Sequence, residues 1–502
     1  MKKLFLAISA LILLAATYVR VHRTSEILGF YYDQGRDALV IADFIKNGKM
    51  FLIGPTTGIA GIFRGPFYYW LITPFYALGG GDPVWPAVFL ALTTVVAIAL
   101  GMYLAHELEG WRSAIIFGLV TSFSFYIVSA SRWLSNPTPM LLISMLLVFS
   151  MFQITRGRSW YWAAVGLLLG LAMQFGSAAE VFYYVAIAVF AVWQRRTMRP
   201  SLKIALVSAG LLFFTFLPQI VFDLRHEGIL SNNIKKFLFD DGSFKASFWE
   251  IVKIRLPFYK DTFFAKIFPS GMENWKFVAG IGLLSLGLNW KKLTNDKKFV
   301  FVLTLMLAPL VGMLFFQGNQ GNVYDYYFTG YYMVFFLLLS VLFGFLARKK
   351  WGLILVLGFL WLFYQQNVPL VKSYITSGTE GESHITLGNQ LQAVDWIIDD
   401  AKKQGAQFNA DSYVPPVIPY AYDYLFLWLT NKRCPQDKCG YVLDPQVPLL
   451  YTLYEVDNPH PERLEAWLAR QAGIGEIKEE ARFGGITVQR RTRIDEKNSL
   501  LP

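Results

Sequence analysis

Residues 330–347 read GYYMVFFLLLSVLFGFLA, an uncharged apolar run that ends at Arg348-Lys349-Lys350. A helix needs about 20 consecutive apolar residues to cross a bilayer, and this run is close to that length. Similar runs recur through a chain of 502 residues that is 55% hydrophobic and only 16% charged. Soluble domains carry about 25% charged residues. The sequence therefore predicts an all-α polytopic membrane protein.

The spacing of the apolar runs predicts eleven membrane-spanning helices, which we call the predicted spans. They are placed at about 4–21, 84–105, 113–130, 137–155, 160–176, 178–194, 203–222, 276–290, 299–316, 330–347 and 351–369. Every second turn, such as Arg156-Gly157-Arg158, is basic, except for the nearly neutral His106–Arg112. The short turns on the other side hold a single Arg and no Lys. Because basic turns stay in the cytoplasm, we expect a cytoplasmic N-terminus and an extracytoplasmic C-terminus in the plasma membrane.

Two features of composition have alternative interpretations. The net charge of +11 is placed in these turns and does not indicate a nucleic-acid partner. Residues 1–16 also fit a signal peptide, although the apolar run continues to Val21, which favours an uncleaved anchor. Both interpretations put residues 22–83 outside the cell.

The predicted spans divide the chain into two domains. Residues 1–370 form the membrane domain, with external loops at about 22–83 and 223–275, and residues 371–502 form an external domain of ordinary soluble composition. The patterns in the external domain predict a small α/β fold. They place helices at 387–404, ending at Gly405, at 418–429 and at 461–472, and strands at 440–443, 449–456 and 485–489.

Cys434 and Cys439 are the two cysteines of the chain and lie in the external domain. An oxidising compartment permits a small loop disulfide between them, with free thiols as the alternative. A zinc site would need more ligands, and no His is close in sequence. We assign no metal site, although a divalent ion remains possible.

The first external loop contains the charged segment Asp33-Gln34-Gly35-Arg36-Asp37. Charges placed among apolar helices are costly without a use, so the segment is a candidate active site. The pattern of Arg36–Asn47 predicts a helix in the membrane interface that ends near Gly48. Asp33 would stand just before that helix, where simple N-capping is the alternative to a functional role.

This segment, extended to Ala38, resembles the Asp-Glu-x-Arg-Tyr-Ala signature of glycosyltransferase family 39 and aminoarabinose transferases. Gly65-Pro66-Phe67-Tyr68-Tyr69-Trp70-Leu71 is similar to that family's His-Pro-Pro-Leu-Tyr-Tyr-Trp-Leu. The resemblance is strongest over about 25–140 and weaker through about 370. It implies a GT-C-like fold and a polyprenyl-phosphate-linked sugar donor. Gln34 and Gly65 depart from the signature, which bears on the acceptor more than on the reaction class.

The resemblance implies that Asp33 is the carboxylate at the reacting centre, with Asp37 as a second acid. Asp33 would act as general base on the acceptor, in a single displacement that inverts the anomeric carbon. The leaving phosphate needs cations or oriented donors. Candidates for binding the donor phosphate or sugar are Arg36, Arg64, Arg132, Glu180 (paired with Gln174), Asp223, Arg225, His226, Tyr324 and Asp325.

Several of these candidates also have structural interpretations. Arg132 could be a solvated interface anchor, Asp223 and Arg225 a local ion pair, and Glu180 a partner of a helix dipole. Phosphate loops of the P-loop type are absent from the sequence, which argues against ATP or nucleotide-sugar use.

The sequence thus predicts a membrane glycosyltransferase that moves a sugar from a polyprenyl-phosphate donor to a glycan, lipid or protein acceptor on the extracytoplasmic face. A polymerase or ligase of lipid-linked glycans is the closest alternative. A transporter or flippase is disfavoured because the predicted spans are almost free of central charges and show no repeated halves. A membrane scaffold that binds a partner through its external domain is a third class.

Overall fold

The computed structural model describes residues 2–58, 61–194, 199–237, 246–270, 272–316, 321–377, 379, 381–415, 418–434 and 439–494. Contacts divide the chain into two compact units. The helical unit consists of Met1–His22, Met50–Ile72 and Val88–Ser373, and the sheet unit of Arg23–Lys49, Thr73–Ala87 and Tyr374–Pro502. Each unit is described by itself.

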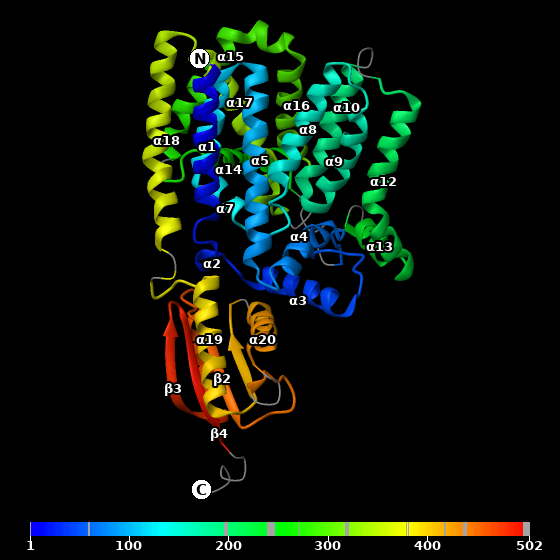
Figure 1. Cartoon of the computed structure of the whole chain (residues 1–502). Helices are drawn as coiled ribbons and strands as arrows, with labels where there is room; N and C mark the ends of the chain where they lie inside the picture. The colour runs from blue at the N-terminus through cyan, green and yellow to red at the C-terminus, as the bar shows by residue number, and fades with distance from the viewer. Residues whose placement is uncertain are drawn as a thin grey trace. The chain divides into compact units, whose positions relative to one another are not determined.

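The chain is mostly helical through its first three quarters (Figure 1). Up to α10 the helices are α1 (Lys2–Val21), α2 (Thr24–Ile27), α3 (Tyr32–Asn47), α4 (Phe67–Leu78), α5 (Val84–Leu108), α6 (Trp111–Phe123), α7 (Phe125–Ser131), α8 (Met140–Thr155), α9 (Tyr161–Phe175), η1 (Ala178–Glu180) and α10 (Val181–Trp193). They continue with α12 (Leu202–Arg225), α13 (Ile229–Lys235), α14 (Phe248–Ala265), η3 (Met272–Asn274), α15 (Trp275–Asn295), α16 (Lys297–Gly312), η5 (Asp325–Phe328), α17 (Thr329–Leu346) and α18 (Lys350–Ser377).

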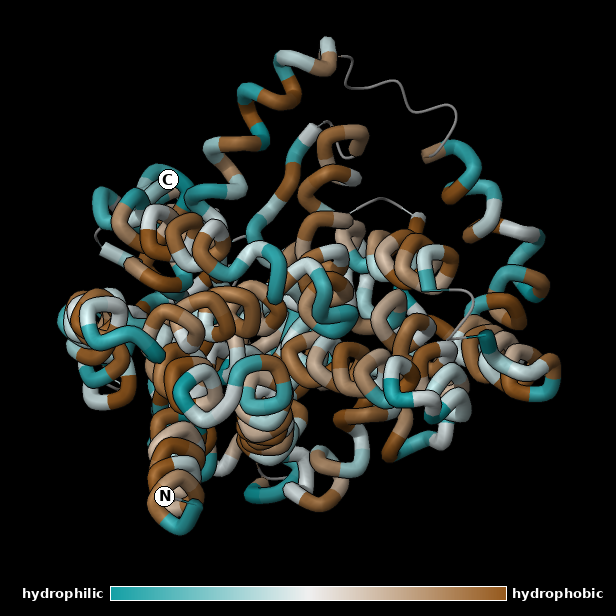
Figure 2. Tube along the Cα trace, turned by 90° about the horizontal axis from the view of Figure 1, so that it is seen from above, coloured by the Kyte–Doolittle hydropathy of each residue, from teal (hydrophilic) through white to brown (hydrophobic). Residues whose placement is uncertain are grey.

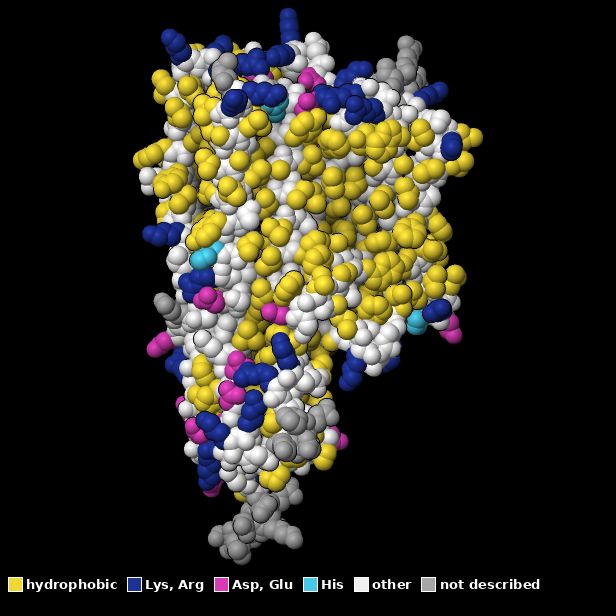
Figure 3. All heavy atoms as spheres, viewed as in Figure 1, with side chains coloured by type: hydrophobic (Ala, Val, Ile, Leu, Met, Phe, Trp, Pro, Cys, Tyr) yellow, Lys and Arg dark blue, Asp and Glu magenta, His cyan; other side chains and the backbone are white. Residues whose placement is uncertain are grey.

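Every predicted span contains a helix, but fewer helices reach the full length of a bilayer crossing. Among the described residues, 5 helices are long and apolar enough, or 6 if α6 and α7, bent by 67°, count as one span. Helices such as α8 and α9 are apolar but shorter. Hydrophobic side chains cover the visible face of the helical unit (Figure 3), and its helices are largely hydrophobic along their length (Figure 2). The chain is a multi-pass integral membrane protein.

The bend between α6 and α7 leaves backbone groups without helical partners inside the helical unit. The fully buried Arg20 of α1 donates from its guanidinium to the carbonyls of Thr121 (2.9 Å) and Ser122 (3.2 Å). On the other side of the break, the amide of Phe125 donates to Asn367 Oδ1 at 2.9 Å. Buried backbone groups must be satisfied, and here side chains from α1 and α18 satisfy them.

The sheet unit contains a four-stranded sheet in the order β1-β2-β4-β3. β1 (Phe408–Tyr413) pairs in parallel with β2 (Leu449–Glu455), and β4 (Ile486–Arg493) pairs antiparallel with both β2 and β3 (Gly475–Phe483). The helices are α19 (Leu387–Gln404), α20 (Tyr420–Arg433) and α22 (Pro461–Ile474), and α19 packs on β3 and β4 (Figure 1). The small C-terminal α/β region expected from the sequence is present.

The predicted helices of this region and the strands at 449–456 and 485–489 are confirmed. The prediction of a strand at 440–443 was wrong, because Tyr441 forms only an isolated bridge with Phe408. β1 and β3 were not predicted. β3 is mostly exposed and rich in Glu, so it has no apolar alternation to detect, and β1 is short and polar.

Helix α3 ends where the sequence placed its end, at Gly48, whose φ of 67° is left-handed. Its start differs from the prediction. The helix begins at Tyr32, so Asp33 lies in its first turn and not before it, and the N-cap is Tyr31. Gly35 is required by packing, since a Cβ there would come within 2.3 Å of the Ala421 backbone nitrogen in α20.

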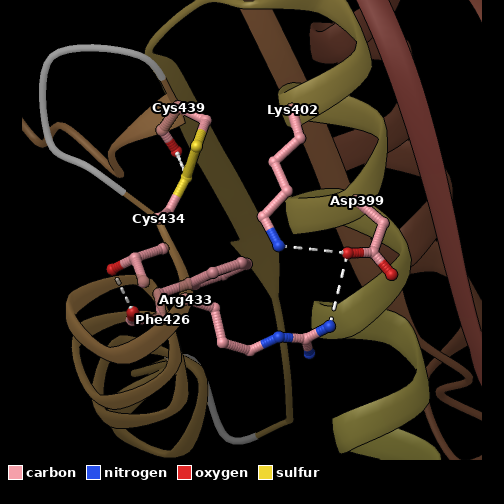
Figure 4. Close-up of a disulfide and its surroundings, with 7 residues drawn as sticks. Asp399, Lys402, Phe426, Arg433, Cys434 and Cys439 are labelled. Carbon is pink, nitrogen blue, oxygen red and sulfur yellow. Dashed lines mark hydrogen bonds and ion pairs between the residues drawn. A yellow bond between two sulfur atoms is a disulfide. The ribbon is translucent and has the colours of Figure 1, made fainter.

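The structure contains the disulfide expected between Cys434 and Cys439, directly after α20 (Figure 4). Their Cα atoms are 5.6 Å apart, within the ordinary range for a disulfide. The preceding residue, Arg433, is paired with Asp399 of α19 at 3.3 Å. The disulfide and this ion pair both fix the C-terminal end of α20.

Candidate active site

The loop that carries Arg64 is held by its own backbone. The amide of Gly54 donates to the carbonyl of Arg64 at 2.7 Å, and the amide of Arg64 donates to the carbonyl of Pro55 at 3.2 Å. A Cβ at Gly54 would lie 2.1 Å from the carbonyl oxygen of Gly65, so this close approach of two chain segments requires glycine. The backbone position of Arg64 is therefore fixed by the contacts of residues 54 and 55 with residues 64 and 65.

Arg64 lines a cavity of about 600 Å³ that lies entirely within the helical unit. Its wall is mainly aliphatic and aromatic and includes Phe63, Met173, Phe182, Phe216, Ile220, Ile234, Phe237 and Phe316. Its polar side chains are those of Thr57, Arg64, Ser177, Gln219, Asp223, Ser231, Tyr326 and Tyr327. A largely apolar cavity with a few convergent polar groups is the usual form of a small-molecule site.

The guanidinium of Arg64 is the cation of this cavity. One Nη lies 3.4 Å from Ser177 Oγ, and the buried Nε has no hydrogen-bond partner among the described residues. Burial lowers the pKa of Arg64, while the nearby Glu180, Tyr326 and Tyr327 act in the opposite direction. Arginine stays protonated in proteins, so the cavity holds a positive charge with unused donor capacity.

Glu180 interacts electrostatically with this charge and is almost completely buried, with 1% of its surface exposed. It accepts a hydrogen bond from the amide of Ser177 in a capping box at the start of η1. Glu180 thus fixes the turn that presents Ser177 to Arg64. The capping box gives Glu180 a structural role at this helix end, and its role in binding the donor stays a prediction.

Two glutamines contact the residues on either side of Arg64. Gln174 donates to Gln219 Oε1 at 2.8 Å, and Gln219 donates to the carbonyl of Phe63 at 3.0 Å. A Cβ at Gly65 would collide with Gln174 Oε1, which is buried without a partner among the described residues. This contact explains why Gly65 stands where the related signature has histidine: the Gln174 side chain fills the space.

We expect Gly65→Ala to destabilise the helical unit by about 1–3 kcal/mol, the usual cost of overpacking a tight contact. The added methyl group must displace the Gln174 side chain. The measurement is the thermal unfolding temperature of the purified protein in detergent. The double variant Gly65→Ala/Gln174→Ala removes the colliding amide and should recover most of the loss. Equal unfolding temperatures of wild type and Gly65→Ala would contradict the contact.

Asp33, Arg36 and Asp37 form a compact charged group at the start of α3 in the sheet unit. Arg36 Nη1 lies 2.9 Å from Asp33 Oδ1, and Arg36 Nη2 lies 2.8 Å from Asp37 Oδ1. The two carboxylates differ in exposure, with 57% for the Asp33 side chain and 7% for that of Asp37. One guanidinium therefore joins a buried carboxylate to an accessible one.

The residues just before α3 contact a buried acid of the sheet unit. Glu455 of β2 accepts a hydrogen bond from Tyr422 at 2.7 Å, and both line a small hollow with Tyr31 and Tyr32. Burial raises the pKa of Glu455 to about 7, against the lowering effect of the Tyr422 hydrogen bond. Its protonation thus changes in the neutral range, next to the start of α3.

The stability of the sheet unit should decrease as the pH rises through about 7. A carboxyl group with a raised folded-state pKa stabilises the fold fully below its unfolded value near 4.5, and that contribution is lost as the pH rises through about 7. The measurement is hydrogen exchange of the β2 amides, corrected for intrinsic rates. A range of roughly pH 5 to 8 covers the titration of Glu455. Glu455→Gln should flatten the profile, and an unchanged profile would exclude Glu455 as its source.

Of the predicted site residues near the end of α12, one lines the Arg64 cavity and two do not. Asp223 lines the cavity and accepts from the amides of Leu230 (2.7 Å) and Ser231 (3.1 Å). Arg225, the last residue of α12, and His226, which follows it, are exposed and do not line the cavity. Both stay predictions as donor-binding residues.

Arg132 is buried, with 4% of its surface exposed, and not solvated. It donates to the carbonyls of Val19 (3.0 Å) and His22 (2.9 Å) at the C-terminal end of α1. This contact satisfies carbonyls that a helix end leaves unpaired. The structure therefore gives Arg132 a role in holding the helical unit together.

Tyr324 and Asp325 lie at the start of η5, whose next residues Tyr326 and Tyr327 line the cavity. Asp325 pairs at 3.0 Å with Lys266, a buried lysine that the sequence analysis missed. Lys266 also lies 4.5 Å from the ring centre of Tyr126. No local motif marks it, because its partners are distant in sequence. Among the described residues, no group of three or more His, Cys, Asp or Glu could hold a metal ion.

Comparisons with known proteins extend these observations. The crystal structure of ArnT from Cupriavidus metallidurans bound to undecaprenyl phosphate matches at a TM-score of 0.56 with 13% identity, covering 97% of this chain and 97% of that chain, and its apo state matches equally. The Archaeoglobus fulgidus oligosaccharyltransferase in the apo form matches at 0.50 with 11% identity, covering 87% of this chain and 64% of that chain. These likenesses show the fold. No curated protein matches the chain.

The fold is that of membrane glycosyltransferases of the GT-C class, and part of the sequence matches one of their families. Residues 64–222, less than half of the chain, match the family described as dolichyl-phosphate-mannose-protein mannosyltransferase. The matched segment begins at Arg64 and includes Glu180. The resemblance drawn from the Asp33 and Gly65 motifs is confirmed at the level of this class.

Proposed function

We propose that the chain transfers a sugar from a polyprenyl-phosphate donor to an acceptor on the extracytoplasmic face of the membrane. The observation that carries the proposal is the cavity at Arg64, where an apolar wall surrounds one guanidinium whose buried Nε has no partner within the described part of the chain. A polyprenyl phosphate is an apolar chain with an anionic end, which matches both parts of this lining. The similar ArnT structure holds undecaprenyl phosphate, which supports the same class of ligand.

Arg64 is suited to stabilise the leaving group. As the bond between the sugar and the phosphate breaks, its electron pair goes to the phosphate, whose charge increases. A guanidinium can donate two parallel hydrogen bonds to phosphate oxygens. Ser177, Tyr326 and Tyr327 add neutral donors at the same cavity. A low-dielectric site makes such preorganised donors effective in the transition state.

Asp33 is proposed as the base that takes the proton of the acceptor hydroxyl as the new glycosidic bond forms. Its side chain is accessible, while Asp37 is buried and anchors the shared Arg36. The ion pair with Arg36 holds the Asp33 carboxylate in a defined orientation. The two carboxylates therefore have separate roles, with Asp37 supporting the geometry and Asp33 acting on the acceptor.

The orientation that we propose has the N-terminus in the cytoplasm, the predicted spans crossing the membrane, and the region after α18 outside. Lys and Arg side chains gather at one end of the helical unit (Figure 3), as expected of a cytoplasmic face. The disulfide between Cys434 and Cys439 fits an oxidising compartment for the sheet unit.

The proposed reaction is tested by comparing the lipids and glycans of cells with and without the gene by mass spectrometry. We expect one specific sugar to be lost from one acceptor when the gene is removed. Purified protein in liposomes with the matching polyprenyl-phosphate sugar should release polyprenyl phosphate in step with transfer. An unchanged profile of lipids and glycans would contradict the proposal and favour transport or scaffolding.

A further inference from the structure

A second cavity, of about 720 Å³, lies entirely within the sheet unit. It is formed by the C-terminal half of α3, the turn after α4 and the C-terminal half of α20. Its floor contains the rings of Tyr76, Tyr424 and Trp428, and its rim carries Asp43, Asn47 and Asn431. Its residues are separate from those of the Arg64 cavity.

The aromatic floor is held in place by hydrogen bonds to one turn. Trp428 Nε1 donates to the carbonyl of Gly80 at 2.7 Å, and the Tyr424 hydroxyl donates to the carbonyl of Gly81. The two rings are nearly parallel, with an interplanar angle of 14°. Gly81 has a φ of 94°, and a Cβ there would lie 2.5 Å from Trp428 Cδ1. The backbone of Gly81 is thus the surface on which the indole rests.

The rim is polar and carries the charged side chains of Asp43, Lys46 and Lys432. Asp43 is bonded by Asn47 at 2.5 Å and lies 3.7 Å from Lys49. Lys432 interacts electrostatically with Asp82. Amides, a carboxylate and two lysines around fixed aromatic rings are suited to a ligand with hydroxyl groups and apolar C–H faces.

We infer that this cavity binds carbohydrate and holds the sugar portion of the acceptor. The inference rests on the proposed function, because the same helix, α3, carries Asp33 at its start and the cavity at its end. A helix rises about 1.5 Å per residue, so Asp33 and Asp43 are about 15 Å apart along α3. An acceptor that reaches both must contain several linked sugar residues. The inference therefore favours an oligosaccharide or glycolipid over a protein side chain.

The test measures binding of the detergent-solubilised full chain to an array of neutral and acidic oligosaccharides. We expect wild type to retain a defined set and Trp428→Ala to lose about tenfold in affinity, or about 1.4 kcal/mol. Trp428→Phe should retain part of the affinity, and Gly81→Ala should lose it by displacing the indole. Asn431→Ala changes an exposed side chain and tests the site without disturbing packing.

Two controls separate this inference from the proposed reaction. Asp33→Asn should abolish transfer yet keep the oligosaccharide binding, and Leu443→Ala, an exposed position elsewhere in the sheet unit, should change neither. Binding without any transfer activity would contradict the proposed function alone. The inference is overturned if wild type retains no oligosaccharide, if Trp428→Ala and Asn431→Ala bind like wild type, or if these variants lose only binding to anionic vesicles.

Discussion

Asp33→Asn is expected to lower kcat for sugar transfer by roughly 10² to 10⁴, the usual contribution of a general base. The amide cannot accept the proton of the acceptor hydroxyl, although it preserves the shape of the side chain. Because Asp33 is accessible, the variant should fold and insert like wild type. The measurement is transfer from a polyprenyl-phosphate sugar in liposomes, together with retention of polyprenyl phosphate, which should not change.

Three further variants make this result interpretable. Asp33→Glu keeps a carboxylate and should recover part of kcat. Asp37→Asn removes the buried partner of Arg36 and should lower both activity and thermal stability. Glu465→Gln alters an exposed carboxylate on α22 and serves as the matched control. Wild-type turnover in Asp33→Asn would eliminate Asp33 as base and direct attention to Glu180 and Asp223 at the Arg64 cavity.

Arg64→Ala is expected to weaken binding of polyprenyl phosphate by about tenfold to a hundredfold. Hydrogen bonds to a charged group contribute about 1.5–3 kcal/mol, and the cavity supplies no other basic side chain among its described lining residues. Arg64→Lys keeps the charge but loses the forked geometry, so an intermediate affinity is expected. The measurement is retention of labelled polyprenyl phosphate by the purified protein.

The matched control for Arg64 is Arg199→Ala, which removes an exposed arginine outside the cavity. A second measurement compares polyprenyl phosphate with the uncharged polyprenol. Arg64→Ala should reduce the preference for the phosphate and leave the binding of polyprenol nearly unchanged. Equal losses for both lipids would mean that Arg64 shapes the cavity and does not bind the anion.

Much of the fold could be predicted because membrane helices and caps leave local signals. Apolar runs located every helix of the predicted spans, and Gly48 and Gly405 marked helix ends through their left-handed conformation. The number of full-length spans was not predictable in this way. Hydropathy shows that a segment is buried, and it does not distinguish a 16-residue helix such as α8 from one that crosses the whole bilayer.

The candidate site was only partly predictable. Arg64, Glu180 and Asp223 were found because charged residues stand out against apolar sequence. Lys266 and Gln219 were missed, since their importance comes from partners far along the chain. In the sequence, Arg132 and Arg64 are both candidates for binding the donor phosphate. Only the packing against α1 shows that the guanidinium of Arg132 donates to backbone carbonyls.

The bend between α6 and α7 has a consequence for biosynthesis. Arg20 leaves the ribosome about a hundred residues before Thr121 and Ser122, the carbonyls that it serves in the finished protein. An arginine inside a bilayer without partners is costly. During that interval the insertion machinery must shelter α1 or leave its charged end at the membrane surface. The hydrogen bonds of Arg20 in α1 are thus completed only after α6 and α7 have been made.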